Sequence, residues 1–219
     1  MELERWNSPS HVRYLLRNDI AGARYLSVAL QSVPGLHRDA WWDRVLLGED
    51  SLDETISEDG EDLPEGCVPY LPCPIDALLQ AIGTLQLQPH DVLVDVGSGI
   101  GRAAALAHFL TGAAVLGIEV QRELAVKARR IANEMKRPRL STVHADADEI
   151  IKYLPIGTAY IFYCPFGKKR MAALLRELQE QARIRRIRIC CIDMPSLEEP
   201  WLRSIGETHH SVNTYESWT

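Results

Sequence analysis

The chain has 219 residues, of which 46% are hydrophobic and 25% charged, and its formal net charge is -6 at pH 7. These values are typical of a soluble globular protein that is long enough for one full core plus an appendage and too short for two ordinary domains. The sequence contains no run of about 18 uninterrupted apolar residues that could cross a bilayer, and the negative charge argues against nucleic acid as a partner.

Two further features of the sequence predict its surroundings. The start, MELERWNSPS, has neither the basic residues nor the apolar stretch of a secretory signal, so we expect a cytoplasmic protein without a membrane association. The cysteine spacing contains no Cys-x-x-Cys pair, which predicts reduced thiols and neither a disulfide framework nor a metal site. The five cysteines are Cys67, Cys73, Cys164, Cys190 and Cys191.

Residues 1–73 are predicted to form an N-terminal helical appendage. Apolar residues recur at spacings of three and four over His11–Gln31, which predicts one amphipathic helix. A second short helix is expected around Trp41 and Trp42. Nine of the seventeen residues in Glu49–Glu65 are acidic, so this acidic loop is predicted to stay outside the core.

From residue 74 to residue 219 the pattern alternates helices and strands with short links. Strands are predicted at Val92–Val96, Ala114–Glu119, Leu140–His144, Ala159–Tyr163 and Arg186–Ile192, and a closing pair at Trp201–Gly206 and Ser211–Trp218. Helices are predicted after Pro74 and at about Gly101–Thr111, Gln121–Lys136, Ala147–Leu154 and Lys168–Arg183. This order predicts an α/β fold with a doubly wound, mostly parallel sheet. Two basic runs, Gly167–Arg170 and Arg183–Arg188, are interpreted as a solvated helix start and a strand flanked by exposed arginines.

The sequence DVGSGIGR joins the first of these strands to a helix, at the edge where parallel sheets bind ligands. A dinucleotide fingerprint requires a small residue at the place of Arg102, and Asp95 would repel a pyrophosphate at the helix N-terminus. A cationic ligand would be attracted by Asp95 and not repelled. S-adenosylmethionine carries a sulfonium and an ammonium and no phosphate, so Asp95 can pair with its amino group while the glycine amides lie against its methionyl part.

In this segment the chain resembles the class I S-adenosylmethionine-dependent methyltransferases, whose first motif is acid-x-Gly-x-Gly-x-Gly. The resemblance extends from about Tyr70 to Tyr163 and beyond. It implies the class I methyltransferase fold, with methyl transfer from S-adenosylmethionine as the activity. The cofactor-binding residues that it implies around the first motif are Asp95, Gly97, Ser98, Gly99 and Gly101.

The resemblance implies further cofactor-binding residues in the family's order. Glu119, followed by Val120, matches the acid that accepts both ribose hydroxyls, and an acceptor-only carboxylate suits two neighbouring donors. Asp146 matches the acid that accepts from the adenine amine, with Asp148 as the alternative and Ala147 offering a backbone amide. The same Asp146 is also a helix N-cap candidate. Tyr70 and Cys73, just before the first helix of the predicted α/β domain, match a family segment that covers the methionine end of the cofactor.

The fourth strand ends in YIFYCPFG, which occupies the family's motif nearest the transferred methyl group. Tyr163 and Cys164 are expected to contact the cofactor there, Tyr163 is the candidate catalytic residue, and Phe166 is a candidate for acceptor binding. No amide or carboxylate stands in Tyr163–Phe166, which argues against nitrogen methylation of nucleobases. Tyr163 either forms a hydrogen bond at the reacting centre or only packs on the cofactor.

Three functions are therefore compatible with the sequence. The first is a methyltransferase whose acceptor is a protein side chain or a small molecule. The second is an NAD(P)-dependent oxidoreductase, against which Arg102 and Asp95 argue. The third is a non-catalytic protein that binds S-adenosylmethionine.

Overall fold

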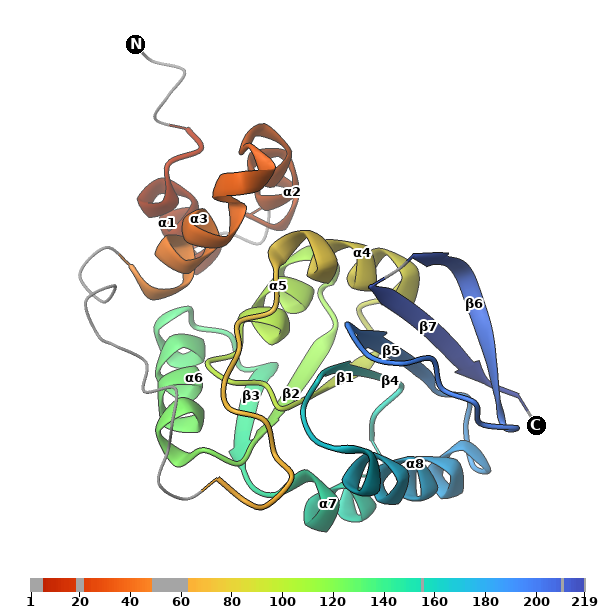
Figure 1. The fold of residues 1–219 in the computed structure, drawn as a ribbon. Coiled ribbons are helices and arrows are strands. Elements are labelled where there is room, and N and C mark those ends of the chain that lie inside the picture. Colours follow the sequence, from red (N-terminus) through yellow and green to blue (C-terminus); the bar gives the residue numbers. More distant parts are fainter. Residues whose placement is uncertain (1–5, 19–21, 49–62, 155, 210, 219) are drawn as a thin grey trace.

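The computed structural model describes residues 6–18, 22–48, 63–154, 156–209 and 211–218. It has a seven-stranded sheet in the order β3-β2-β1-β4-β5-β7-β6 (Figure 1). The strands are β1 Val92–Val96, β2 Ala114–Glu119, β3 Leu140–His144, β4 Ala159–Tyr163, β5 Arg188–Ile192, β6 Leu202–His209 and β7 Val212–Ser217. The first five are parallel, and β7 is antiparallel to both β5 and β6.

Helices cover both faces of the sheet (Figure 1). The helices of this domain are α4 Ile75–Leu85, α5 Arg102–Thr111, α6 Arg122–Glu134, α7 Ala147–Ile150 and α8 Lys168–Ala182, with a 3₁₀ turn, η2, at Ile151–Tyr153. Leu93 and Ile161 belong to the core shared with α4 and α5, whereas Val94 and Phe162 belong to the core shared with α8. Strands buried on both faces explain why these segments are almost wholly apolar.

Three N-terminal helices, α1 Pro9–Asn18, α2 Gly22–Ser32 and α3 Gly35–Leu47, pack beside α4 and α5 (Figure 1). The prediction of one helix over His11–Gln31 is wrong, because the structure has two helices on either side of residues 19–21. Asn18 and Gly22 bound the interruption, and both residue types favour helix ends over helix interiors. Trp42 is fully buried between the appendage and the domain core.

The other element predictions agree closely with the structure. The first four strands have the predicted bounds, while β5 begins two residues later than predicted and α7 gives way to η2 after Ile150. The strand predicted at Trp201–Gly206 is β6, which continues to His209. Most of the predicted acidic loop, residues 49–62, lies outside the described residues. Among the described residues, no helix combines the length and the apolar character needed to cross a membrane.

Candidate functional site

The glycine turn lies at the carboxyl end of β1, between that strand and α5. Gly97 and Ser98 donate their backbone N–H groups to the carbonyl of Ile118 at 2.9 and 3.1 Å, which ties the turn to β2. Gly99 has a φ of 54°, and a β-carbon there would lie 2.1 Å from the ring of Tyr70. Glycine is therefore required at position 99, both for the left-handed backbone and for the aromatic ring that covers it.

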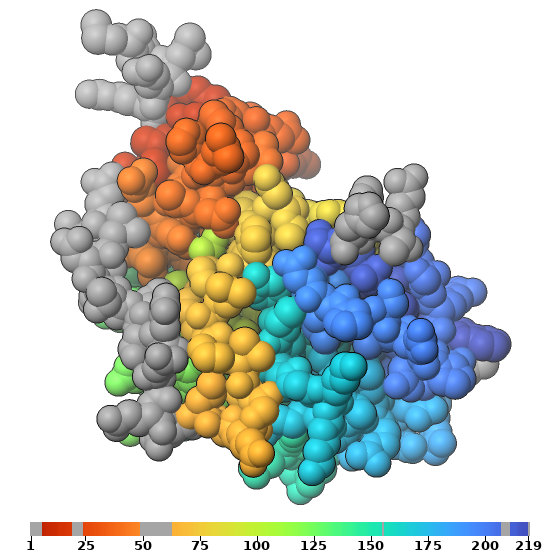
Figure 2. Space-filling view, in the orientation of Figure 1, coloured from red at the N-terminus to blue at the C-terminus, as the bar shows by residue number. Residues whose placement is uncertain are grey.

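The segment before α4 runs over the surface of the molecule (Figure 2), and its Tyr70 covers Gly99 of the turn. Val68 donates its N–H to the carbonyl of Pro165 at 3.3 Å, and Gly167 donates to the carbonyl of Gly66 at 2.8 Å, so the segment is held against the end of β4. Tyr70 and Cys73 are largely buried there, and burial raises the pKa of both side chains well above its usual range. Both residues thus lie beside the glycine turn as neutral groups.

A hollow of about 30 Å³ lies between this segment, the glycine turn and β4. Tyr70, Cys73, Asp95, Gly97, Ser98, Arg102 and Tyr163 are among the residues that line it. The hollow brings together the segment before α4, the first motif and the end of the fourth strand, which are far apart in the sequence. A space of this size holds about one water molecule.

Asp95 is 6% exposed, and its Oδ2 has no hydrogen-bond partner among the described residues. Burial, together with the charge of Glu119, raises its pKa to about 7, although the N–H of Ala104 hydrogen-bonds to its carboxylate. An ionised carboxylate in this position lacks a cation. A ligand with an ammonium group would supply it, so the residue fits the amino group of S-adenosylmethionine.

Glu119 ends β2 and is buried beside the same turn. Its Oε2 accepts the N–H of Gly99 at 2.7 Å, and its Oε1 accepts the N–H of Gln121 at 2.8 Å. Burial raises the pKa of Glu119 despite these hydrogen bonds. Each oxygen keeps a second lone pair, so the carboxylate is oriented and can still accept two ligand hydroxyls. Val120 follows it, and its carbonyl lies 3.0 Å from His144 Nε2.

Asp146 and Asp148 follow β3 and lie next to Arg170. Asp146 is the N-cap of α7, where its Oδ1 accepts the N–H of Asp148 at 3.2 Å. Arg170 forms ion pairs with both aspartates, at 3.1 Å to Asp148. The N-cap interpretation is therefore confirmed. Asp146 keeps a second oxygen for a ligand, and the buried Ala147 follows it directly.

The end of β4 divides into two environments. Tyr163 lines the hollow with Asp95. Phe166 instead pairs through its backbone with Cys67 and lies beneath the guanidinium of Arg170, 5.6 Å from its ring centre. Phe166 is thus on the Asp146 side of the site and is not among the residues lining the hollow.

Cys164 connects the end of β4 to the end of β5. Its φ is 43°, and its Sγ donates to the carbonyl of Asp193 at 3.0 Å. Asp193 follows β5 and is exposed. Burial is the main cause that raises the pKa of Tyr163 and of Cys164, and the Asp193 carboxylate adds to it in both cases. Tyr163 is therefore a neutral hydroxyl beside a negative charge.

Arg102 is the main residue that the sequence analysis missed as part of the site. It is 6% exposed, lines the hollow, and forms ion pairs with Asp39 at 2.7 Å and Asp43 at 3.0 Å, both on α3. The sequence contains one indication of this contact. Asp39 and Asp43 are four residues apart in the helix predicted around Trp41 and Trp42, so both lie on one face of that helix. Asp193 was also missed, because nothing in its local sequence distinguishes it.

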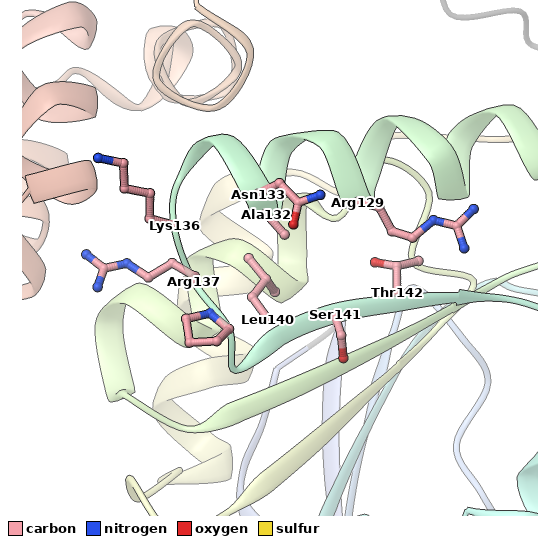
Figure 3. A pocket seen from close by; sticks show the side chains of 9 residues that line it. Arg129, Ala132, Asn133, Lys136, Arg137, Leu140, Ser141 and Thr142 are labelled. Carbon is pink, nitrogen blue, oxygen red and sulfur yellow. The ribbon is translucent and has the colours of Figure 1, made fainter.

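A second hollow, of about 530 Å³, lies between α6 and β3 at the edge of the sheet (Figure 3). Its basic side chains diverge, because Lys136 and Arg137 point away from Arg129 (Figure 3). Arg137 also donates to the carbonyl of Leu16 and lies over the ring of Phe109. These cations do not converge on one point, as recognition of an anion requires.

One protein family matches part of the chain. The sequence model of the protein-L-isoaspartate(D-aspartate) O-methyltransferase family matches residues 75–152, from α4 to η2. The match covers less than half of the chain and includes the glycine turn, Glu119 and Asp146, but neither α3 nor the end of β4. No curated protein matches the chain.

Solved structures of other proteins share the fold. An RNA methyltransferase from Salinibacter ruber in complex with S-adenosyl-L-homocysteine is 23% identical, with a TM-score of 0.55 over 67% of this chain and 92% of that chain. MtNAS in complex with MTA and tNA is 15% identical, with a TM-score of 0.51 over 65% of this chain and 59% of that chain. At these identities the likeness concerns the fold.

Proposed function

We propose that this class I S-adenosylmethionine-dependent methyltransferase transfers the methyl group to an amine, on a protein side chain or a small molecule. The observation that carries the proposal is the place of Asp193 at the end of β4, where its backbone carbonyl accepts from Cys164 Sγ at 3.0 Å and its charge adds to the raised pKa of Tyr163 and of Cys164. A negative charge there attracts a cationic or neutral amine and repels a carboxylate or phosphate. Asp39 adds to the negative potential around Tyr163.

The cofactor would bind along the carboxyl ends of β1 to β4. In this proposal Asp95 binds the amino group, Gly97, Ser98, Gly99 and Gly101 lie against the methionyl part, and Glu119 with Val120 holds the ribose. Asp146 and Ala147 contact the adenine, and Tyr70, Cys73 and Cys164 cover the methionine end. The oriented Glu119 and the unpartnered oxygen of Asp95 support these assignments.

The bound cofactor supplies a methyl group that its sulfonium already activates. The chain therefore has to align the acceptor for an in-line displacement, which can account for much of the rate. Tyr163 donates a hydrogen bond at this point, and its raised pKa keeps it a donor at neutral pH. As the neutral amine forms its bond to the methyl carbon and the bond to sulfur breaks, the positive charge passes from sulfur to nitrogen, and Asp193 stabilises it there. An amine that arrives neutral needs no base.

Labelling with a radioactive methyl donor tests the acceptor class. Lysate fractions would be treated with protease or nuclease, and the stability of the label to mild base would be measured. We expect label that nuclease does not release and that survives base, as methylated amines do. Base-labile label would indicate a carboxyl ester, the chemistry named by the matching family, and would refute the amine proposal.

A charge-neutral variant tests the role of Asp193. Asp193→Asn should raise the acceptor KM about tenfold or more, because one charge-assisted contact is lost, while binding of S-adenosylhomocysteine stays unchanged. Glu198→Gln is the matched control, since Glu198 is an exposed acid in the same connection. Equal effects of the two substitutions on the acceptor KM would indicate a general charge effect and remove Asp193 from acceptor recognition.

A cytoplasmic location is part of the same proposal. All five cysteines are free thiols, which is the state expected in a reducing compartment. Nucleic acid is not favoured as the acceptor, because Asp193 and Asp39 surround the end of β4 with negative charge. The prediction of an appendage in residues 1–73 and a catalytic domain in residues 74–219 is retained here as the proposed division of the chain.

A further inference from the structure

We propose that Arg102 binds the carboxylate of the methionine end of the cofactor and that Asp39 and Asp43 of α3 position it for this role. The inference rests on S-adenosylmethionine being the cofactor. It gives the N-terminal helices a part in cofactor binding, although they lie outside the segment matched by the methyltransferase family.

The first observation is a pair of unpartnered polar atoms beside one hollow. Asp95 Oδ2, an acceptor, and Arg102 Nε, a donor, are both buried and have no partner among the described residues. Both residues line the hollow beside Tyr70 and Tyr163. Burying such groups without partners is costly, so their presence at a ligand site indicates a ligand that supplies a donor and an acceptor together.

The α-amino acid end of the cofactor has this combination. Its ammonium is a donor that suits Asp95, and its carboxylate is an acceptor that suits the guanidinium of Arg102. Ser98 Oγ is a third buried atom without a partner among the described residues, but it lies over Gly117 of β2. We therefore assign the carboxylate to Arg102 and give Ser98 no part in this pairing.

The second observation is how Arg102 is held. Its Nη2 donates to Asp39 at 2.7 Å and its Nη1 donates to Asp43 at 3.0 Å, so both terminal nitrogens are held, and Nε is the guanidinium nitrogen without a partner among the described residues. The planar guanidinium is therefore already oriented, and little side-chain entropy is lost when a ligand binds.

The ion pair between Arg102 and Asp43 of α3 also balances two opposite charges beside the site. Asp43 is buried enough that its pKa is raised, although the charge of Arg102 opposes this shift. Losing the arginine would leave Asp43 without its cation, and losing Asp43 would leave the guanidinium free to turn. Asp43 is therefore a positioning residue for the arginine, and it acts on the cofactor only through it.

Two ligands that differ in the amino acid end separate this role from a structural one. S-adenosylhomocysteine has the ammonium and the carboxylate, whereas methylthioadenosine has the same nucleoside and thioether without them. Binding would be measured by titration calorimetry, with displacement by S-adenosylhomocysteine for the weaker ligand. For Arg102→Met we expect a tenfold to hundredfold loss of affinity for S-adenosylhomocysteine and at most a threefold change for methylthioadenosine.

Matched variants complete the experiment. Arg38→Met removes another arginine that joins α3 to α4, through Asp76 at 2.5 Å, without lining the hollow, and it should leave the ratio of the two affinities unchanged. Asp43→Asn should lower the ratio in the same direction as Arg102→Met, by a smaller factor. Equal losses for both ligands in Arg102→Met, or no loss, would overturn the proposal. A wild-type protein that binds neither ligand would refute the cofactor assignment instead.

Discussion

Asp95 is predicted to destabilise the ligand-free protein at neutral pH. Its pKa is raised to about 7 from an ordinary value of 3.8, chiefly by burial and then by Glu119. A shift of roughly three units corresponds to about 4 kcal/mol. Because the folded state binds the proton more tightly, the free energy of unfolding falls as the pH rises from about 4 to about 7, and above that pH the whole cost is present.

Asp95→Asn should reverse this cost. The asparagine side chain has the same shape as the carboxylate and no charge. Its buried amide N–H has no hydrogen-bond partner, however, and this costs about 1 to 3 kcal/mol of the free energy of unfolding. The variant is therefore expected to be more stable than the wild type by about 1 to 3 kcal/mol at pH 8. At pH 4 the wild-type carboxyl is mostly protonated, and the advantage should disappear.

Urea denaturation of the ligand-free proteins at pH 4 and pH 8 measures this difference. The reasoning is wrong if the variant is less stable than the wild type at pH 8, or if the difference between the two proteins is the same at both pH values. Binding gives a second measurement. Wild-type affinity for S-adenosylhomocysteine should rise up to tenfold per unit from pH 5 to pH 7, because Asp95 must lose its proton to pair with the ammonium, whereas Asp95→Asn should bind weakly without this dependence.

Two further predictions concern the ribose and the reacting end. Glu119→Ala should weaken binding of S-adenosylhomocysteine by roughly 2 to 4 kcal/mol, since two charge-assisted hydrogen bonds are lost and water replaces part of them; unchanged affinity in a calorimetric titration of the folded variant would remove the ribose assignment. Tyr163→Phe should keep cofactor affinity and lower the single-turnover rate about tenfold to hundredfold, as loss of one transition-state hydrogen bond of about 1 to 3 kcal/mol implies. A full rate in Tyr163→Phe would leave that ring with packing alone.

The strands of the sheet were predictable because their sequences are compatible with few other secondary structures. Val92–Val96 and Ala159–Tyr163 are short apolar runs between turn residues, and their bounds in the structure are those expected. The two-helix start of the chain was not predictable from spacing, because the apolar residues keep the same period across residues 19–21. Periodicity reports which face is buried, and it does not report where the backbone turns.

The site was predictable only where one local segment contains its chemistry. Asp95, the glycines and Glu119 stand in contiguous strand-to-loop segments, so their positions follow from the strand order. Arg102 is different, because its partners Asp39 and Asp43 come from a helix about sixty residues earlier in the sequence. Asp193 likewise reaches Cys164 only because β5 pairs with β4. Contacts of this kind depend on packing between elements, which local patterns do not encode.

Asp95 and Arg102 together separate ligand binding from stability. Asp95→Asn removes a buried charge without a cation and should raise the free energy of unfolding at pH 8, whereas Arg102→Met breaks two ion pairs to α3 and should lower it. Both variants are nevertheless expected to bind S-adenosylhomocysteine more weakly, because each loses one partner of its amino acid end. Loss of binding that accompanies opposite changes in stability cannot arise from unfolding. It would show that Asp95 is held in an unfavourable state in the free protein because the cofactor supplies its cation, whereas Arg102 serves both the packing of α3 and the ligand.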